Sequence, residues 1–266
     1  MPQDNRKPLE SGKINNILRQ EKFVVLQGAP GTGKTFSALE VAKNYDIVHF
    51  EQFHAETTFS DFVYGIRPVL GVDKLLYEAN EGVLYRAVKS AQDNPNKRVL
   101  LIIDEINRAN LSNVLGPVFY LFEKNQSNHK YKIKIGDLEL DALPEKLFVI
   151  ATMNTADRSL AVVDFALRRR FTWLTLKPHE IQELDFQKDY FNDFESLFQK
   201  YATDDELNLQ PGQSYFIAKD ENEMKERLEY EIMPLMKEYF NEGYLLKAKD
   251  EFSNYFYIKL GVLMYE

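Results

Sequence analysis

The sequence predicts an α/β fold, in which a five-stranded parallel sheet flanked by helices is followed by a small helical domain. Three observations carry this prediction. Apolar runs of strand length alternate with segments of helical periodicity up to residue 174. A glycine-rich loop joins the first apolar run to the helix after it. Beyond Lys177-Pro178 the alternation stops and helical periodicity dominates. We therefore expect two domains, over residues 1–178 and 179–266.

The expected elements of the first domain are five strands that alternate with helices. The strands are expected at residues 23–26, 47–50, 99–103, 147–151 and 171–174. The helices are expected at residues 9–20 (a lead-in helix), 36–43, 57–63, 81–93, 111–124 and 160–168. The run Val99-Leu100-Leu101-Ile102-Ile103 is apolar throughout, which is typical of a parallel strand covered on both faces. Alternating residues on either side of Gly136-Asp137 predict a hairpin within residues 129–140.

The second domain is expected to be mainly helical. Residues 226–240 have the periodicity of a helix with one apolar face, formed by Leu228, Ile232, Leu235, Met236 and Tyr239. The chain contains 15 tyrosines and 19 phenylalanines, and many of them lie in this domain. We expect these rings to pack in a core and not to form a surface for stacking bases.

The composition excludes several classes of protein. The net charge of −8 argues against a surface that binds nucleic acid without a partner. No segment approaches the ~18 apolar residues that a membrane span requires, and the first residues lack the apolar centre of a signal peptide. The absence of cysteine rules out disulfides and zinc–thiolate sites and fits a reducing compartment. We therefore expect a cytoplasmic protein.

The glycine-rich loop has the pattern of a phosphate-binding P-loop. Its residues are Gly28, Ala29, Pro30, Gly31, Thr32, Gly33, Lys34 and Thr35. The glycines allow backbone N–H groups to turn inward around phosphate oxygens, and the start of the following helix adds partial positive charge. Lys34 is expected to reach the β- and γ-phosphates, and the Thr35 hydroxyl to bind Mg²⁺. The loop predicts that the protein binds a nucleoside triphosphate.

Acidic and amide residues follow two of the expected strands. Asp104 and Glu105 come directly after the run over residues 99–103. In a P-loop protein the first acid helps to hold Mg²⁺ and the second polarises the attacking water. Asn154 follows the strand over residues 147–151, so neighbouring parallel strands would bring its amide beside Glu105. We expect Asp104 to bind the metal, Glu105 to act as general base and Asn154 to position water.

Three consecutive arginines, Arg168, Arg169 and Arg170, lie at the end of an expected helix. One interpretation is a favourable interaction of these charges with the helix dipole. The other is that at least one arginine reaches the γ-phosphate of a neighbouring subunit. We favour the second interpretation.

Two long motifs resemble those of one family. The first runs from Asp104 to Asn110 (Asp-Glu-Ile-Asn-Arg-Ala-Asn), and the second from Met153 to Asp164 and on to Arg170-Phe171. Gln52-Phe53-His54 and Gly65-Ile66-Arg67-Pro68 are also similar. Together they resemble the AAA+ module of the McrB family, the motor subunits of modification-dependent restriction systems. The resemblance covers roughly residues 20–245.

The resemblance implies a Mg²⁺-dependent motor that assembles as a hexameric ring, with nucleotide sites at subunit interfaces. It implies GTP as the preferred nucleotide, with ATP as the alternative, and an endonuclease partner of the McrC type. Asn154 corresponds to the family's sensor position, and Arg169 and Arg170 to its trans-acting arginines. Candidate interface residues are Arg108, Arg158 and Arg168.

The chain also departs from the family in two respects. Gly212-Gln213-Ser214-Tyr215-Phe216 is similar to a Gly-His-Ser-Tyr-Phe motif of the family's lid, but Gln213 replaces the histidine, so no nucleotide-contact role is assigned to it. Only about 20 residues precede the first strand, where the family usually has a DNA-reading domain, and no nuclease pattern is present. We expect DNA to be contacted through a partner or through a domain outside this sequence.

These observations predict an AAA+ nucleoside triphosphatase that drives a restriction or related defence complex. One alternative is an ATP-driven remodelling chaperone of the MoxR or dynein-related branch, which acts on protein. A second is a module that uses nucleotide only as a switch for assembly.

Overall fold

The chain forms two compact units. The computed structural model describes residues 7–70, 75–123, 131–156 and 165–265. The sheet unit combines Leu9–Gln27 with Thr35–Thr175. The helical unit contains Gly28–Lys34 and the described residues from Leu176 onward, together with Lys7 and Pro8. The division into domains at residue 178 stays a prediction.

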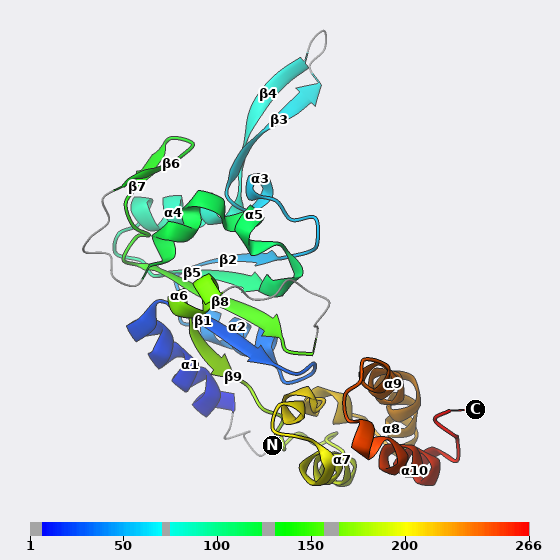
Figure 1. The fold of residues 1–266 in the computed structure, drawn as a ribbon. Helices are drawn as coiled ribbons and strands as arrows, with labels where there is room; N and C mark the ends of the chain where they lie inside the picture. Colours follow the sequence, from blue (N-terminus) through cyan, green and yellow to red (C-terminus); the bar gives the residue numbers. More distant parts are fainter. Residues whose placement is uncertain (1–6, 71–74, 124–130, 157–164, 266) are drawn as a thin grey trace. The chain divides into compact units, whose positions relative to one another are not determined.

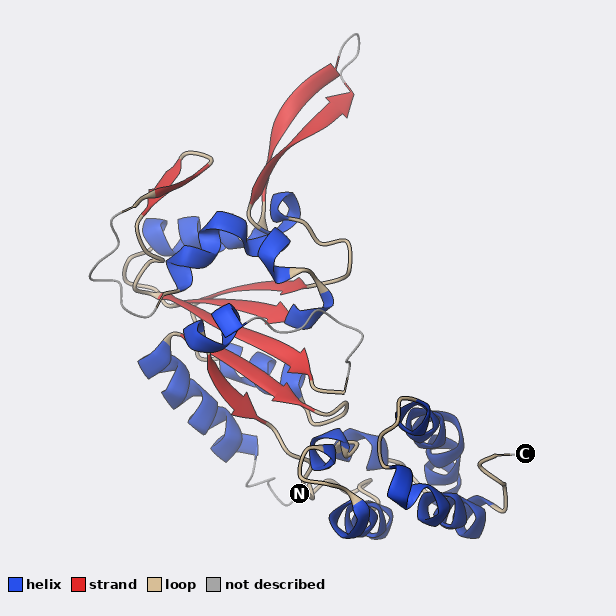
Figure 2. Ribbon diagram, viewed as in Figure 1, coloured by secondary structure: helices blue, strands red, loops and turns tan. Residues whose placement is uncertain are grey.

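The sheet unit is built on five parallel strands in the order β2-β5-β8-β1-β9. They are β1 (Phe23–Gly28), β2 (Ile47–Gln52), β5 (Val99–Asp104), β8 (Leu147–Asn154) and β9 (Thr172–Thr175). All of β5 and all but the last residue of β8 are buried, as expected for strands covered on both faces. Helices α1 and α2 lie on one face, and α4 and α5 on the other (Figures 1 and 2). The predicted fold class is confirmed.

The helices of this unit begin and end close to the predicted positions in most cases. They are α1 (Lys7–Glu21), α2 (Lys34–Ala42), α3 (Phe59–Phe62), α4 (Val83–Asp93), α5 (Leu111–Leu115) and α6 (Phe165–Arg170). Helix α3 is short, and a capping box between Thr58 and Asp61 stabilises its N-terminus. The Thr58 side chain accepts from the Asp61 N–H, and the Asp61 carboxylate accepts from the Thr58 N–H. Part of the helix predicted at residues 160–168 lies outside the described residues.

The single helix predicted at residues 111–124 is wrong. Helix α5 ends at Leu115, and a 3₁₀ helix follows over Gly116–Phe122. Gly116 has a φ of +44°, a value that favours glycine, and Pro117 cannot donate a hydrogen bond back into α5. The apolar stripe survives this break, because Val114, Val118, Leu121 and Phe122 are all buried.

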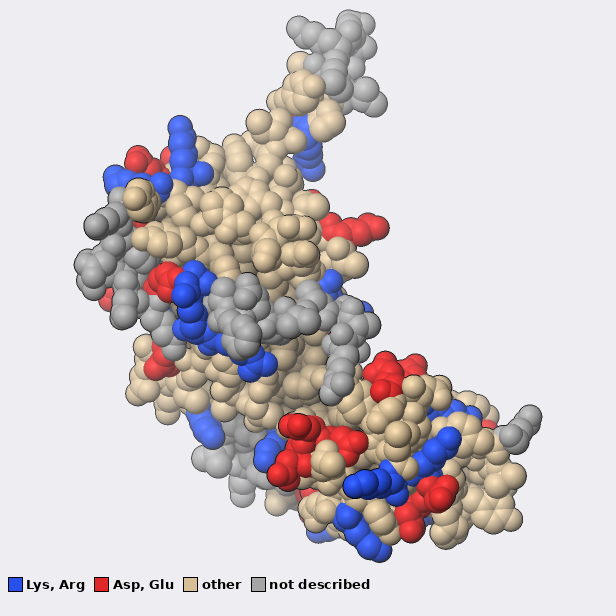
Figure 3. Space-filling view, viewed as in Figure 1, with Lys and Arg blue, Asp and Glu red and all other residues tan. Residues whose placement is uncertain are grey.

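The sheet unit contains two β-hairpins among its described residues, of which the sequence predicts one. Strands β6 (Ile133–Ile135) and β7 (Leu138–Leu140) form the expected hairpin around Gly136-Asp137. Strands β3 (Tyr64–Leu70) and β4 (Leu75–Glu81) form an unpredicted antiparallel arm that projects from the sheet unit (Figure 1). Pro68 and Gly65 interrupt the strand pattern, but an edge strand tolerates proline. The visible, described part of the arm is mostly uncharged (Figure 3).

The helical unit packs around aromatic rings. Its elements are α7 (Lys188–Tyr201), 3₁₀ turns at Glu206–Leu209, Gln213–Phe216 and Leu246–Ala248, α8 (Glu221–Arg227), a π-helical segment (Leu228–Ile232), α9 (Met233–Asn241) and α10 (Lys249–Leu260). Phe194 of α7 packs against Phe252 of α10, with ring centroids 5.2 Å apart, and both are fully buried. The prediction that these aromatic residues form a core is confirmed for this pair. None of the described helices combines the length and apolarity needed to cross a bilayer.

Candidate nucleotide-binding site

The predicted P-loop joins β1 to α2 and has the backbone of a tight loop. Gly31 and Gly33 have φ values of +77° and +81°. Residues with a Cβ rarely adopt these angles, so glycine is required at both positions. The loop therefore has the conformational feature that its sequence predicted.

The Lys34 ammonium group is held at the start of the loop. Its Nζ donates to the carbonyl oxygens of Gly28 (3.0 Å) and Ala29 (2.8 Å), and the side chain is buried. The Thr32 hydroxyl also donates to the Ala29 carbonyl (2.9 Å). A buried ammonium needs such partners, and phosphate oxygens are stronger acceptors than these neutral carbonyls.

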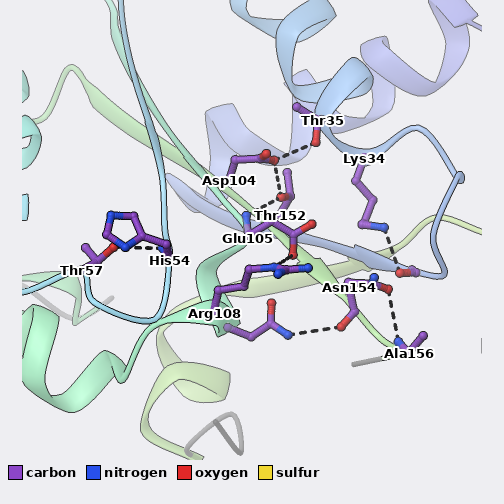
Figure 4. A network of polar contacts seen from close by, with 12 residues as sticks. Lys34, Thr35, His54, Thr57, Asp104, Glu105, Arg108, Thr152, Asn154 and Ala156 are labelled. Atoms are coloured by element: carbon purple, nitrogen blue, oxygen red, sulfur yellow. Dashed lines mark hydrogen bonds and ion pairs between the residues drawn. The ribbon is translucent and has the colours of Figure 1, made fainter. Parts of the chain in front are cut away.

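A chain of three hydrogen bonds lies at the carboxyl ends of β5 and β8 in the sheet unit (Figure 4). Thr35 Oγ1 donates to Asp104 Oδ1 (2.7 Å), and Thr152 Oγ1 donates to the same oxygen (2.6 Å). The Glu105 N–H in turn donates to Thr152 Oγ1 (3.0 Å). The structure thus brings together Thr35 and Asp104, which are 69 residues apart in the chain.

Thr35 and Asp104 fit a magnesium ion in their chemistry. A hydroxyl and a carboxylate are hard oxygen donors, and Mg²⁺ takes few protein ligands, completing its shell with water and phosphate. Among the described residues there is no group of three or more His, Cys, Asp or Glu side chains that could hold a metal. A site that depends on substrate phosphates needs no such group.

Thr152 was not predicted as a site residue. It follows the apolar run over residues 147–151, and its side chain is buried. In the sequence, the hydroxyl residue after a fully apolar strand is the one sign that Thr152 belongs to the site. It does not show which residue the hydroxyl contacts. The partner follows from strand register, because Ile103 pairs with Ala151 and the next residues are Asp104 and Thr152.

We expect Thr152→Val to weaken the Asp104 site. Valine keeps the shape of the side chain but removes the hydroxyl, which takes away one acceptor of the Glu105 N–H and one donor to Asp104. The free energy of unfolding should fall by about 1–3 kcal/mol, and the Mg²⁺ concentration for half-maximal nucleotide binding should rise. Titration with Mg²⁺ and chemical denaturation measure both. Thr152→Ser, which retains the hydroxyl, is the control; equal behaviour of the Val and Ser variants would contradict the role of the hydroxyl.

Glu105 has an unusual backbone conformation for a residue with a side chain. Its φ and ψ are 55° and 48°, in the left-handed region, and it precedes the 3₁₀ helix Ile106–Arg108. Such strain is often found at functional sites. Its Oε2 lies 3.6 Å from Arg108 Nε in the same chain. Arg108, a predicted interface residue, therefore has a partner within its own subunit.

Asn154 ends β8, the strand next to β5 in the sheet. Its Oδ1 accepts from the Ala156 N–H (3.2 Å), and its carbonyl accepts from Asn107 Nδ2 (3.3 Å). Asn107 is buried and lies two positions after Glu105, so this bond ties the end of β8 to the segment that carries the predicted base. Asn154 and Glu105 therefore belong to adjoining segments, as the strand order predicted (Figure 4).

The three arginines of α6 have different surroundings. Arg170 is 8% exposed; its guanidinium lies 4.2 Å from the Phe119 ring centroid and pairs with Glu123. Arg169 pairs with the same carboxylate (2.8 Å) but is 65% exposed. Arg168 lies over the Trp173 ring at 5.2 Å. Arg170 is thus held inside its own subunit, whereas Arg169 is the more accessible of the two. Arg158 lies outside the described residues.

Two family models match the chain in order. The model described as "AAA domain (dynein-related subfamily)" matches residues 23–171, and the model described as "McrB, alpha-helical lid domain" matches residues 197–245. The first covers the P-loop and the segments that carry Asp104, Glu105 and Asn154. The second lies within the helical unit.

Two curated proteins are similar to the chain. The type IV methyl-directed restriction enzyme EcoKMcrB subunit of Escherichia coli (strain K12) is 34% identical over 271 residues, which cover 85% of this chain and 56% of that protein. The type II restriction enzyme BsuMI component YdiS of Bacillus subtilis (strain 168) is 28% identical, covering 58% of this chain and 57% of its own length. The chain thus spans a little over half the length of these relatives. The resemblance drawn from the sequence motifs is confirmed.

Proposed function

Because the chain belongs to the dynein-related subfamily of AAA domains, we propose that it is a Mg²⁺-dependent nucleoside triphosphatase and the motor of a restriction complex. Nucleotide hydrolysis is the activity that membership of this family implies. The observation that carries the proposal is the hydrogen-bonded set Thr35, Asp104, Thr152 and Glu105. Its first member, Thr35, directly follows Lys34 of the P-loop. This set combines metal donors and a candidate base in one network.

In the proposed reaction, water attacks the γ-phosphorus of the bound nucleotide. Glu105 takes a proton from the water as the new P–O bond forms, and the bond to the bridging oxygen breaks and releases nucleoside diphosphate. Lys34 and the loop N–H groups bind the phosphates, and Asn154 orients the water. Thr35 and Asp104 would hold Mg²⁺, which when bound neutralises phosphate charge. An arginine of a neighbouring subunit, Arg169 in preference to Arg170, stabilises the developing charge.

The proposal also covers the preferred nucleotide, the oligomeric state and the partner protein. GTP as the preferred nucleotide, a hexameric ring and an endonuclease subunit of the McrC type follow from the resemblance to McrB. Both curated relatives are described as parts of restriction enzymes, which supports a nuclease partner. Residues 1–178 would form the motor domain and residues 179–266 its lid, with DNA contacted through the partner or another domain. A cytoplasmic location is proposed from the absence of cysteine.

We expect the purified chain to bind GTP more tightly than ATP in the presence of Mg²⁺. Competition between the two against one fluorescent nucleotide measures the ratio directly. A tenfold ratio, about 1.4 kcal/mol, is the minimum for a clear preference. ATP preference, or equal affinity, would contradict the GTP assignment and favour the remodelling chaperone.

The two alternatives can be separated by their partners and their turnover. The match to a dynein-related AAA model is the observation that favours a remodelling chaperone. Recovery of a nuclease subunit in a pull-down supports the restriction motor, whereas recovery of a protein client supports the chaperone. Steady-state hydrolysis with the partner present would exclude a module that uses nucleotide only as an assembly switch.

A further inference from the structure

The first five backbone carbonyls of the P-loop, those of residues 28–32, are hydrogen-bonded, and three of them have partners in one distant segment. Gly28 and Ala29 accept from Lys34. The next three carbonyls accept from residues 212–214 of the same unit, which we call the clamp segment. Gly212 N donates to Pro30 O (2.8 Å), Ser214 N to Gly31 O (3.2 Å) and Gln213 Nε2 to Thr32 O (3.1 Å).

The two segments are in direct backbone contact. A Cβ on Gly212 would lie 2.1 Å from the Gly31 carbonyl carbon. A Cβ on Gly31 would lie 2.6 Å from Ser214 Oγ and 2.7 Å from the Tyr215 ring. Glycine at both positions therefore allows an approach close enough for the three hydrogen bonds. Burial raises the pKa of the Tyr215 hydroxyl, so this ring packs against the loop in its neutral form.

Gln213 makes the one clamp bond that depends on a side chain. The residue is buried, and its Nε2 faces the Thr32 carbonyl. The amide can have only one orientation there, because its oxygen would repel another carbonyl oxygen. Among the described residues, Gln213 Oε1 has no hydrogen-bond partner. Within the described part of the chain, the hydrogen bond to the Thr32 carbonyl is thus the polar contact that accompanies the burial of this side chain.

The direction of the loop carbonyls determines the direction of its N–H groups. A P-loop binds phosphate through N–H groups that turn to the inside, which requires the carbonyls to turn to the outside. We propose that Gln213 is a positioning residue for phosphate binding, which acts by holding the Thr32 carbonyl on the outer side of the loop. This inference rests on the proposed nucleotide-binding function. It assigns a role to the glutamine that replaces the family's histidine.

The test compares the affinities of variants of the 266-residue chain for Mg²⁺-GTP and for tripolyphosphate, which has neither base nor ribose. Gln213→Ala should weaken both by roughly the same factor, about tenfold, and should raise KM while leaving kcat nearly unchanged. Gln213→Glu should weaken both further, because a carboxylate would face the Thr32 carbonyl. Gln213→His should retain most of the affinity, because an imidazole N–H can donate to that oxygen.

Gln187→Ala is the matched control. Gln187 Nε2 donates to the Ala218 carbonyl (2.7 Å) in the same unit, and Ala218 is not part of the P-loop. Both Ala variants should lower Tm to a similar extent, but only the change at Gln213 should weaken phosphate binding.

Three outcomes would overturn the inference. Wild-type affinity in Gln213→Ala would exclude the role, and an equal loss in Gln187→Ala would make the effect one of general stability. A loss for GTP without a loss for tripolyphosphate would mean that Gln213 acts on the base or the ribose. If the wild-type protein bound no nucleotide, both the proposed function and this inference would be wrong. That result differs from the three outcomes above, in which the wild-type protein binds nucleotide.

Discussion

Glu105→Gln is expected to reduce nucleotide hydrolysis by about 10²–10⁴-fold while leaving nucleotide affinity nearly unchanged. Glutamine has the same shape as glutamate but cannot accept the proton of the attacking water. The left-handed backbone at this position should be retained, because the substitution does not alter the Cβ. Phosphate release under steady-state conditions gives kcat, and titration with a fluorescent nucleotide gives Kd.

The control for this prediction is Glu139→Gln. Glu139 is a surface residue, 63% exposed, that pairs loosely with Lys132 in the β6–β7 hairpin, so kcat should not change. Hydrolysis at the wild-type rate in Glu105→Gln would show that another group is the base. Loss of nucleotide binding in the same variant would show that Glu105 acts in binding and not in the chemical step.

Arg169→Ala is expected to lower kcat by about 10³–10⁵-fold if the arginine acts across a subunit interface. The family resemblance indicates Arg169 and Arg170, and only Arg169 is largely exposed. Arg170→Ala should instead lower Tm, because it removes the contact with Phe119 and one partner of Glu123. Phosphate release and thermal unfolding distinguish the two effects.

A mixing experiment tests whether Arg169 acts in trans. Arg169→Ala subunits keep an intact Glu105, and Glu105→Gln subunits keep an intact Arg169. Each variant alone should be nearly inactive, but mixed rings should regain activity wherever a Glu105→Gln subunit presents its arginine to an Arg169→Ala neighbour. A mixture as inactive as its components would contradict the trans assignment.

Several features of the fold could be predicted because they depend on neighbouring residues. The P-loop follows from glycine positions, and its positive φ values at Gly31 and Gly33 are local properties. The buried strand β5 follows from a continuous apolar run. The arm β3–β4 was not predicted; Gly65 and Pro68 are untypical of a strand interior, although a two-stranded arm accepts them. The single helix predicted at 111–124 is wrong because apolar periodicity continues through Gly116 and Pro117, whereas the α-helical backbone ends at Leu115.

By itself, the sequence determined the sheet, the P-loop and the family, since glycine positions, apolar runs and motifs are read residue by residue. Only the tertiary structure decided which side chains meet. Thr152 reaches Asp104 through the register of neighbouring strands, and Gln213 reaches Thr32 across 181 residues. Arg169 and Arg170 are adjacent in sequence, yet one is exposed and the other buried against Phe119. Local patterns do not encode such distinctions, because burial and hydrogen-bond partners depend on segments that are distant in the chain.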